Sequence, residues 1–194
     1  MGYAEHFRDN ALKQFDYYKV LGERTFAQLS DDELFWQYND ESNSIAVMVK
    51  HISGNMLSRW TDFLNTDGEK EWRNRDQEFE VSFETREQLM AVWNKGWDCM
   101  VGALKEIDAS NFDQTIYIRN IAHSITEAVV RQIAHIASHI GQIIYVGKMI
   151  KGTDWESLSI PRGQSEAFNQ KSFDKGKRSE HYTQETINRD FPKK

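Results

Sequence analysis

The stretch Ser124–Lys151, SITEAVVRQIAHIASHIGQIIYVGKMIK, decides the fold because it carries the longest helical pattern in the chain. Its apolar residues return at three- and four-residue steps, which is the period of an amphipathic α-helix. Ser124 and Glu127 have the spacing of a capping box and predict the first turn of this helix. His135 and His139 stand four residues apart, so both imidazoles project from one face. Such a pair can supply part of a metal site.

The same periodicity predicts three more long helices, at residues 5–29, 43–65 and 85–108. Polar connections separate them, and the longest is a charged loop over residues 66–84. A short β-branched and aromatic run at residues 115–118 predicts an extended segment. We therefore expect an all-α, antiparallel four-helix bundle with a long loop between the second and third helices and a C-terminal extension.

Length and composition favour one globular domain. The chain has 194 residues and a formal net charge of −6, and an acidic balance argues against a general nucleic-acid binder. We expect the bundle to span residues 1–170 and a polar, loosely held tail to span residues 171–194. The single cysteine, Cys99, excludes an internal disulfide and fits a reducing compartment. With no leader or membrane-span pattern, we expect a soluble, cytoplasmic protein with neither membrane nor nucleic-acid partners.

A third histidine has a matching position on the second helix. His51 falls beside the apolar arc of residues 43–65, as His135 and His139 fall beside the arc of their own helix. If the two helices are neighbours, all three side chains can meet between them. His123 precedes His135 by 12 residues, which is roughly 18 Å along a continuous helix, so we exclude it from the same site.

Three neutral imidazoles suit Zn²⁺ or Ni²⁺ and leave coordination positions open for water or substrate. The alternative is that the histidines are satisfied within the core without a metal. Ile136 follows His135, so the HExxH motif of zincin proteases is absent. The chain also lacks a phosphate-binding glycine loop and a Gly-x-Ser-x-Gly elbow.

Two segments resemble the DinB/YfiT-like superfamily: SIAVMVKHISGNMLSRWTDFL at residues 44–64, around His51, and HIASHIGQIIYVGKMI at residues 135–150. An uncharacterised subfamily of that group is similar to the chain through three more stretches, WRNRDQEF at 72–79, IRNIAHSITEA at 118–128 and LSIPRGQSEAFN at 158–169. The resemblance implies a four-helix bundle, often homodimeric, with a metal site of three histidines. It places His51, His135 and His139 at the metal-ligand positions.

The resemblance also implies a metal-dependent enzyme acting on a small molecule, either a hydrolase or an S-transferase that uses a low-molecular-weight thiol. A non-catalytic metal-binding or stress-related dimeric protein is the alternative. Arg73, Arg75 and Arg162 lie on loops typical of the subfamily and are candidate anchors for an anionic substrate, because arginine binds carboxylates in a bidentate manner. Equally, these arginines could only lock the loops together. Trp93 and Trp97 on the third helix are expected in the core or at an interface, and a tryptophan-rich face there would favour a homodimer.

Overall fold

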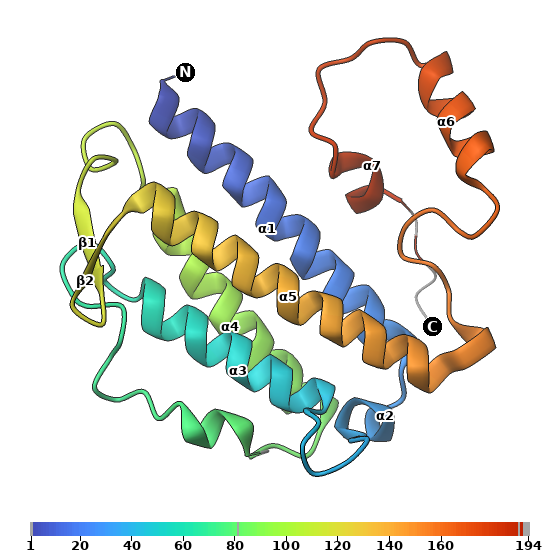
Figure 1. Ribbon diagram of the computed structural model, residues 1–194, viewed down its shortest axis with the longest axis horizontal. Coiled ribbons are helices and arrows are strands. Elements are labelled where there is room, and N and C mark those ends of the chain that lie inside the picture. Colours follow the sequence, from blue (N-terminus) through green and yellow to red (C-terminus); the bar gives the residue numbers. More distant parts are fainter. Residues whose placement is uncertain (1, 81, 190, 192–194) are drawn as a thin grey trace.

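The computed structural model describes residues 2–80, 82–189 and 191, and helices make up most of it (Figure 1). The four long helices are α1 (Tyr3–Gln28), α3 (Ile45–Trp60), α4 (Arg86–Lys105) and α5 (Ile125–Lys151). The shorter elements are α2 (Asp31–Phe35), η1 (Asp76–Phe79), β1 (Thr115–Ile118), β2 (Ile121–Ser124), η2 (Gly152–Asp154), α6 (Ser165–Asp174) and α7 (Gln184–Ile187). The prediction of an all-α chain is confirmed. Within the described ranges, no helix is both long and apolar enough to cross a membrane.

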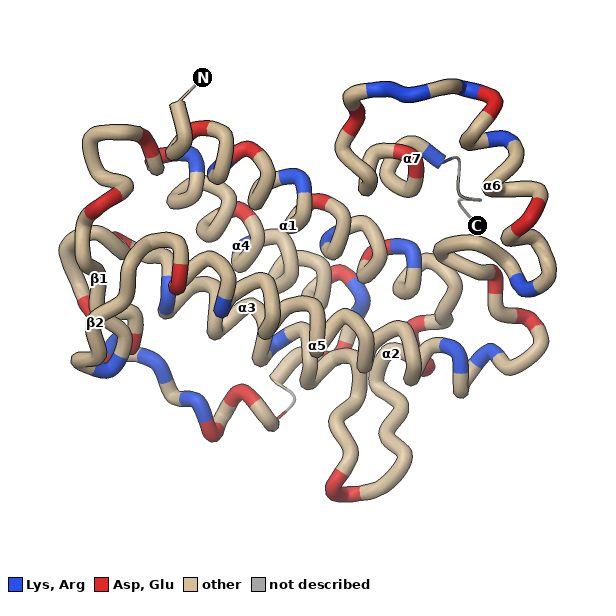
Figure 2. Tube along the Cα trace, turned by 45° about the horizontal axis from the view of Figure 1, so that its top comes forward, with Lys and Arg blue, Asp and Glu red and all other residues tan. Residues whose placement is uncertain are grey.

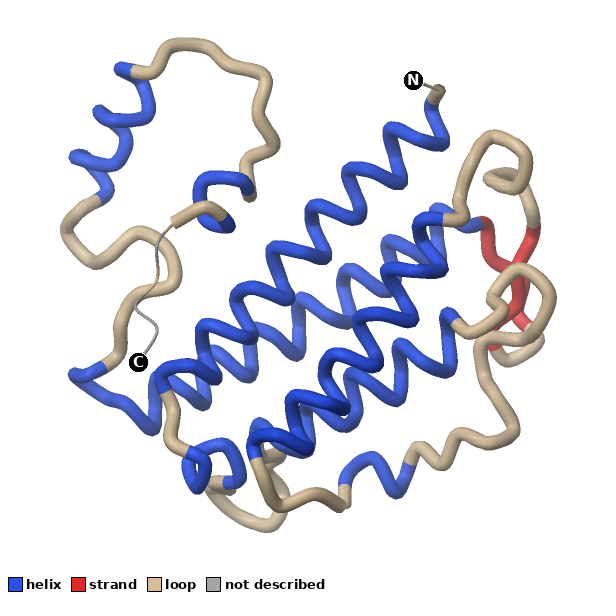
Figure 3. The backbone as a smooth tube through the Cα atoms, turned by 180° about the vertical axis from the view of Figure 1, so that it is seen from behind, coloured by secondary structure: helices blue, strands red, loops and turns tan. Residues whose placement is uncertain are grey.

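The long helices lie side by side around a shared core, with α1 packed along α5 and α3 along α4 (Figures 1 and 3). Helices α3 and α5 run in opposite directions and also touch. Trp93 and Trp97 of α4 are fully buried and contact each other edge to face at 5.3 Å between ring centroids. These tryptophans therefore belong to the core of the chain itself, as one of the two expectations held, and they do not form an exposed face for a dimer.

The helix ends follow the predicted caps. The hydroxyl of Ser124 accepts a hydrogen bond from the backbone N–H of Glu127, whose carboxylate accepts one from the N–H of Ser124. Ser44 caps α3 through its hydroxyl alone. Helix α3 ends at Trp60, earlier than the prediction of about residue 65, because the chain turns at Asp62, where φ is 46°.

A small hairpin closes the end of the molecule where α5 begins (Figure 3). Strands β1 and β2 pair from Thr115↔Ser124 to Ile118↔Ile121, which confirms the extended run. The two turn residues, Arg119 and Asn120, have φ of 56° and 59°, as a two-residue type I′ turn requires. Position 123 therefore lies on β2 and not on a continuous helix.

The C-terminal segment folds back along α1. Helix α6 crosses the predicted boundary at residue 170, and α7 contacts α1. Arg24 of α1 donates hydrogen bonds to three backbone carbonyls of this segment, at 2.6–3.1 Å, in residues Thr186, Ile187 and Arg189. Several Lys and Arg residues occupy the loop between α6 and α7 (Figure 2). The division into a bundle and a loosely held tail stays a prediction, and residues 190 and 192–194 of that tail lie outside the described residues.

Candidate metal centre

Three histidines meet in the groove between α3 and α5. His51 is contributed by α3, and His135 and His139 by α5, and one ring nitrogen from each lies within 4.8 Å of the other two. The Nε2 atoms of His51 and His135 are 3.2 Å apart. His51 is buried, while the other two are partly exposed. The structure thus brings together the three residues that the sequence singled out.

Glu78 fixes the orientation of His51. Its Oε2 atom lies 2.9 Å from Nδ1 of His51, and both side chains are only 7% exposed. Burial alone would raise the pKa of Glu78, but hydrogen bonds from His51 and Arg73 lower it overall, so the carboxylate is ionised at neutral pH. An ionised carboxylate can only accept, and His51 must therefore carry its proton on Nδ1. The lone pair on Nε2 then faces the other two histidines.

Arg73 and Gly54 together determine the position of Glu78. Arg73 donates two hydrogen bonds to the carboxylate, from Nε at 2.8 Å and from Nη2 at 3.0 Å. Gly54 leaves room for it against α3, because a Cβ atom there would lie 2.8 Å from the Cδ atom of Glu78 and closer still to Oε1. The position of this carboxylate therefore depends on a glycine one helical turn after His51.

The imidazoles of His135 and His139 differ in the hydrogen-bond partner of Nδ1. Nδ1 of His139 donates a hydrogen bond of 2.9 Å to Oε1 of Gln142, which leaves Nε2 free to act as a ligand. Nδ1 of His135 is buried and has no hydrogen-bond partner among the described residues. Burial, followed by the neighbouring His139 and His51, lowers the pKa of His135 to about 3. Burial also lowers the pKa of His139, so both rings are neutral at neutral pH.

This arrangement fits a divalent metal ion. Zinc–nitrogen bonds of 2.0–2.1 Å in a tetrahedral shell place two ligand nitrogens about 3.3 Å apart, and the His51–His135 separation of 3.2 Å agrees with that value. Metal-binding histidines typically donate the other ring N–H to a carboxylate or a carbonyl oxygen. His51 and His139 do so through Glu78 and Gln142. The three histidines could therefore hold a metal ion.

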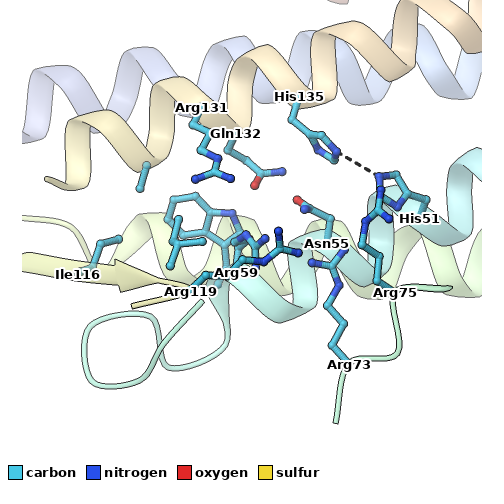
Figure 4. A pocket seen from close by; sticks show the side chains of 13 residues that line it. His51, Asn55, Arg59, Arg73, Arg75, Ile116, Arg119, Arg131, Gln132 and His135 are labelled. Atoms are coloured by element: carbon cyan, nitrogen blue, oxygen red, sulfur yellow. Dashed lines mark hydrogen bonds between the residues drawn. The ribbon is translucent and has the colours of Figure 1, made fainter. Parts of the chain in front are cut away.

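A cavity of about 190 Å³ adjoins the centre and is lined by His51 and His135 but not by His139. Figure 4 shows it between α3 and α5, with the hairpin at one end and the two histidines at the other. Five arginines line it: Arg59, Arg73, Arg75, Arg119 and Arg131. The remaining lining residues include buried amides and apolar side chains: Asn55, Gln132, Trp60, Ile116, Ile118 and Ala128.

Two of the three arginines predicted to anchor a substrate lie here. Arg73 and Arg75 line the cavity, but Arg73 is bound to Glu78 and also lies 3.5 Å from Glu69. Arg162 is exposed in the turn before α6 and does not line the cavity. Its role stays a prediction. In the loop at residues 66–84, Trp72 is 60% exposed, whereas the side chains of Glu78 and Phe83 are buried.

The sequence arguments missed Glu78, Gln132 and Arg131. Arg131 stands four residues before His135, on the face already singled out, so helical spacing could have identified it. Gln132, three residues before His135, carries the same signal. Glu78 lies 27 residues from His51 in an irregular segment, where no periodic signal links the two.

The all-α fold and the histidine cluster define a helical protein with a candidate metal centre. The chain belongs to the DUF1572 family, proteins of unknown function, whose sequence model matches residues 2–164. A search of curated proteins finds no match to the chain. A search of solved structures likewise finds none.

Proposed function

We propose that the chain is an antiparallel four-helix bundle of the DinB/YfiT-like type and a metal-dependent enzyme that acts on a small molecule. The ligands are His51, His135 and His139, and the metal is Zn²⁺ or Ni²⁺. The observation that carries this proposal is the convergence of three imidazole ring nitrogens within 4.8 Å at the wall of a cavity. Catalytic metal sites commonly combine three protein ligands with an open position of this kind.

A divalent metal bound there supplies a Lewis acid, which lowers the pKa of a thiol or water that binds to it. This chemistry suits an S-transferase that uses a low-molecular-weight thiol, or a hydrolase. The side chains of the chain have separate tasks. Glu78 and Gln142 hold His51 and His139 in the tautomers that present Nε2. The buried position of His135 keeps its imidazole neutral and able to coordinate.

The first test is the metal content of the untagged protein, measured by elemental analysis after loading with Zn²⁺ or Ni²⁺. His139→Ala removes a ligand and should abolish stoichiometric metal. His123→Ala is the matched control, because His123 lies on β2, where its Nδ1 contacts the carbonyl of Ile121, and it should bind metal as the wild type does. Equal metal content in the wild type and in His139→Ala would overturn the site.

The second test is turnover. The metal-loaded protein is screened for thiol transfer to small electrophiles and for hydrolysis of small esters and amides, with His139→Ala as the inactive reference. Activity that depends on the histidine supports an enzyme. Stoichiometric metal without any turnover would instead favour a non-catalytic metal-binding protein.

We also propose a homodimer, for which the resemblance to DinB/YfiT-like proteins is the support. Because the tryptophans of α4 are buried, the interface must use another surface. Light scattering should give twice the chain mass of 22.7 kDa. A monomeric mass at micromolar concentration would contradict the proposal.

A further inference from the structure

We propose that the arginine-lined cavity binds the carboxylate or phosphate group of the substrate and so orients its reactive end toward the histidines. This rests on the proposed function for the role of the ligand, but the anion site itself does not need the metal. The substrate class is therefore a small molecule with an anionic group at one end. The argument uses the spacing of the lining residues, their charges and their unpartnered polar atoms.

Two antiparallel rows of polar residues form the long walls of the cavity. On α3, His51, Asn55 and Arg59 follow one another at intervals of four residues. On α5, Arg131 precedes His135 by the same interval. Because four residues advance a helix by about 6 Å, each row leads from a histidine to an arginine in one or two turns. Figure 4 shows Arg59, Arg119 and Arg131 toward the end of the cavity away from His51 and His135.

The charge of the lining is unbalanced. Glu69 and Glu78 are the carboxylates that the described structure places against these arginines. Glu69 pairs with Arg59 at 3.0 Å and with Arg119 at 3.0 Å, while Arg73 is shared between both carboxylates. Five guanidinium groups thus face two carboxylates.

The remaining two arginines have no salt bridge among the described residues. Arg131 donates a hydrogen bond of 3.2 Å to Nε2 of His123, a partner that carries no negative charge. Arg75 lies over the ring of Phe79, at 5.1 Å from its centroid. An anion at the end of the cavity away from His51 would supply the negatively charged partner that Arg131 lacks, and bidentate hydrogen bonds to an oxyanion suit arginine. Arg75 lies at the other end, beside His51 (Figure 4).

Buried N–H groups in the same walls also lack partners. Nε2 of Gln132 and Nε1 of Trp60 are buried and have no acceptor in the described part of the chain, although both residues line the cavity. Gln132 is 4% exposed and Trp60 is 3% exposed. A buried donor without an acceptor is destabilising, so such groups usually face a ligand or an ordered water. The oxygens of a carboxylate or phosphate can accept from them.

Asn55 adds an acceptor between the two ends. Its Oδ1 atom is buried, lines the cavity and has no donor among the described residues. Figure 4 shows the amides of Asn55 and Gln132 between His135 on one side and Arg131 on the other. A ligand hydroxyl or amine would satisfy this oxygen. The cavity therefore selects an anionic group at the arginine end, a hydrogen-bond donor in the middle and a reactive atom beside His51 and His135.

Titration calorimetry with three probes tests the site: inorganic phosphate, succinate, and succinamide as the uncharged analogue of succinate. The wild type should bind phosphate, succinate or both in a saturable and salt-sensitive manner, and should not bind succinamide. Preference for phosphate indicates a phosphate ester as the substrate, and preference for succinate indicates a carboxylate. Failure of both anions to bind at millimolar concentration would overturn the proposal.

Variants locate the binding. Arg131→Gln, at an exposed position of α5, should weaken anion binding at least tenfold. Lys148→Gln, at an exposed position of the same helix that does not line the cavity, should leave the affinity unchanged. Gln132→Glu is a second variant of nearly equal size, and its carboxylate should exclude the anion from the cavity. Thermal melts confirm that each variant is folded. Equal anion affinities in Arg131→Gln and Lys148→Gln would contradict the assignment.

His139→Ala separates this proposal from the metal. His139 does not line the cavity, so the folded variant should lose metal and still bind the anion within a factor of two of the wild type. Anion binding that disappears together with the metal would show that the probe binds at the histidines, and the cavity assignment would fail. If the wild type bound the anion but no metal, the anion site would be supported and only the proposed metal centre would be overturned.

Discussion

At the residue scale, Glu78 decides how well His51 can serve as a ligand. Glu78→Gln replaces the carboxylate that holds Nδ1 of His51 with a neutral amide and leaves Arg73 without its buried partner. We expect metal affinity to fall by 10–100-fold, as it does when partners of metal-binding histidines are changed. Competition with a chromophoric chelator measures the affinity.

The matched control is Glu80→Gln, on the same loop with an exposed side chain. It should bind metal like the wild type. Gly54→Ala is a complementary variant that keeps the carboxylate but displaces it, because the new methyl group would overlap Glu78. An affinity in Glu78→Gln equal to that of Glu80→Gln would show that the hydrogen bond to His51 does not tune the site.

The candidate site could be predicted in part because its main residues lie on regular helices. His51, His135 and His139 share a helical phase, and a period of 3.6 residues carries that information through the sequence. Glu78 has no such phase. Its place beside His51 depends on how an irregular loop folds over α3 and on the space that Gly54 leaves, and these are properties of tertiary structure.

At the element scale, Gly96 sets the close approach of α3 and α4. A Cβ atom at this position of α4 would lie 2.8 Å from the Cα atom of Ser53, which is backbone and cannot swing away. Gly96→Ala should therefore lower the free energy of unfolding by about 1–3 kcal/mol, the usual cost of overpacking. Urea denaturation measures the change.

Gly102 provides the control on the same helix. A Cβ atom there meets nothing within 4 Å, so Gly102→Ala should raise the free energy of unfolding by up to about 1 kcal/mol through helix propensity. If both alanine variants were equally stable, the α3–α4 contact at Gly96 would not be as close as described.

Asp67 joins the loop after α3 to the hairpin. Its carboxylate accepts hydrogen bonds from the backbone N–H groups of Glu69 at 2.7 Å, Arg119 at 2.8 Å and Asn120 at 2.7 Å. Burial alone would raise its pKa, but these hydrogen bonds lower it overall. Because the folded pKa lies below the unfolded value, the stabilisation is present above about pH 4 and is lost as the pH falls through the folded pKa.

Asp67→Asn should accordingly destabilise the protein at pH 7, and the difference from the wild type should shrink as the pH approaches 3. Urea denaturation at several pH values measures this difference. Asp113→Asn, at an exposed position before β1, should show no such pH dependence. A constant difference between Asp67→Asn and the wild type from pH 7 to pH 3 would contradict the role of the charge.

The elements themselves were predictable where local chemistry determines them. The capping box at Ser124 and Glu127 fixes the start of α5, and both the sequence and the structure place it there. The end of α3 was placed too late because the left-handed conformation of Asp62 leaves no mark in the apolar periodicity. Strand β2 was missed because its residues pair with β1 and follow no alternating apolar pattern of their own.

At the scale of the whole molecule, Arg24 fastens the C-terminal segment to α1. Its guanidinium donates to three carbonyls around α7 and lies 5.4 Å from the ring centroid of Phe191. Arg24→Gln should release α7, because hydrogen bonds from a charged donor contribute about 1.5–3 kcal/mol. Amide hydrogen exchange followed by mass spectrometry should show at least tenfold faster exchange in residues 182–189.

Amide hydrogen exchange in α3 and α5 should stay unchanged. Lys19→Gln is the control, because Lys19 forms a salt bridge of 3.2 Å with Glu23 of its own helix. Wild-type exchange rates in residues 182–189 of Arg24→Gln would show that other contacts hold the segment. The result would also test the predicted division of the chain at residue 170.

The histidine centre joins helices that are far apart in sequence, since His51 and His135 are separated by 84 positions along the chain. An ion held there acts as a reversible cross-link, since the unfolded chain cannot present the same set of nitrogens. Occupancy and folding then become linked equilibria, and a free metal concentration 100 times the dissociation constant adds about 2.7 kcal/mol to stability. For the proposed metal centre, metal starvation would therefore shorten the lifetime of the protein against proteolysis.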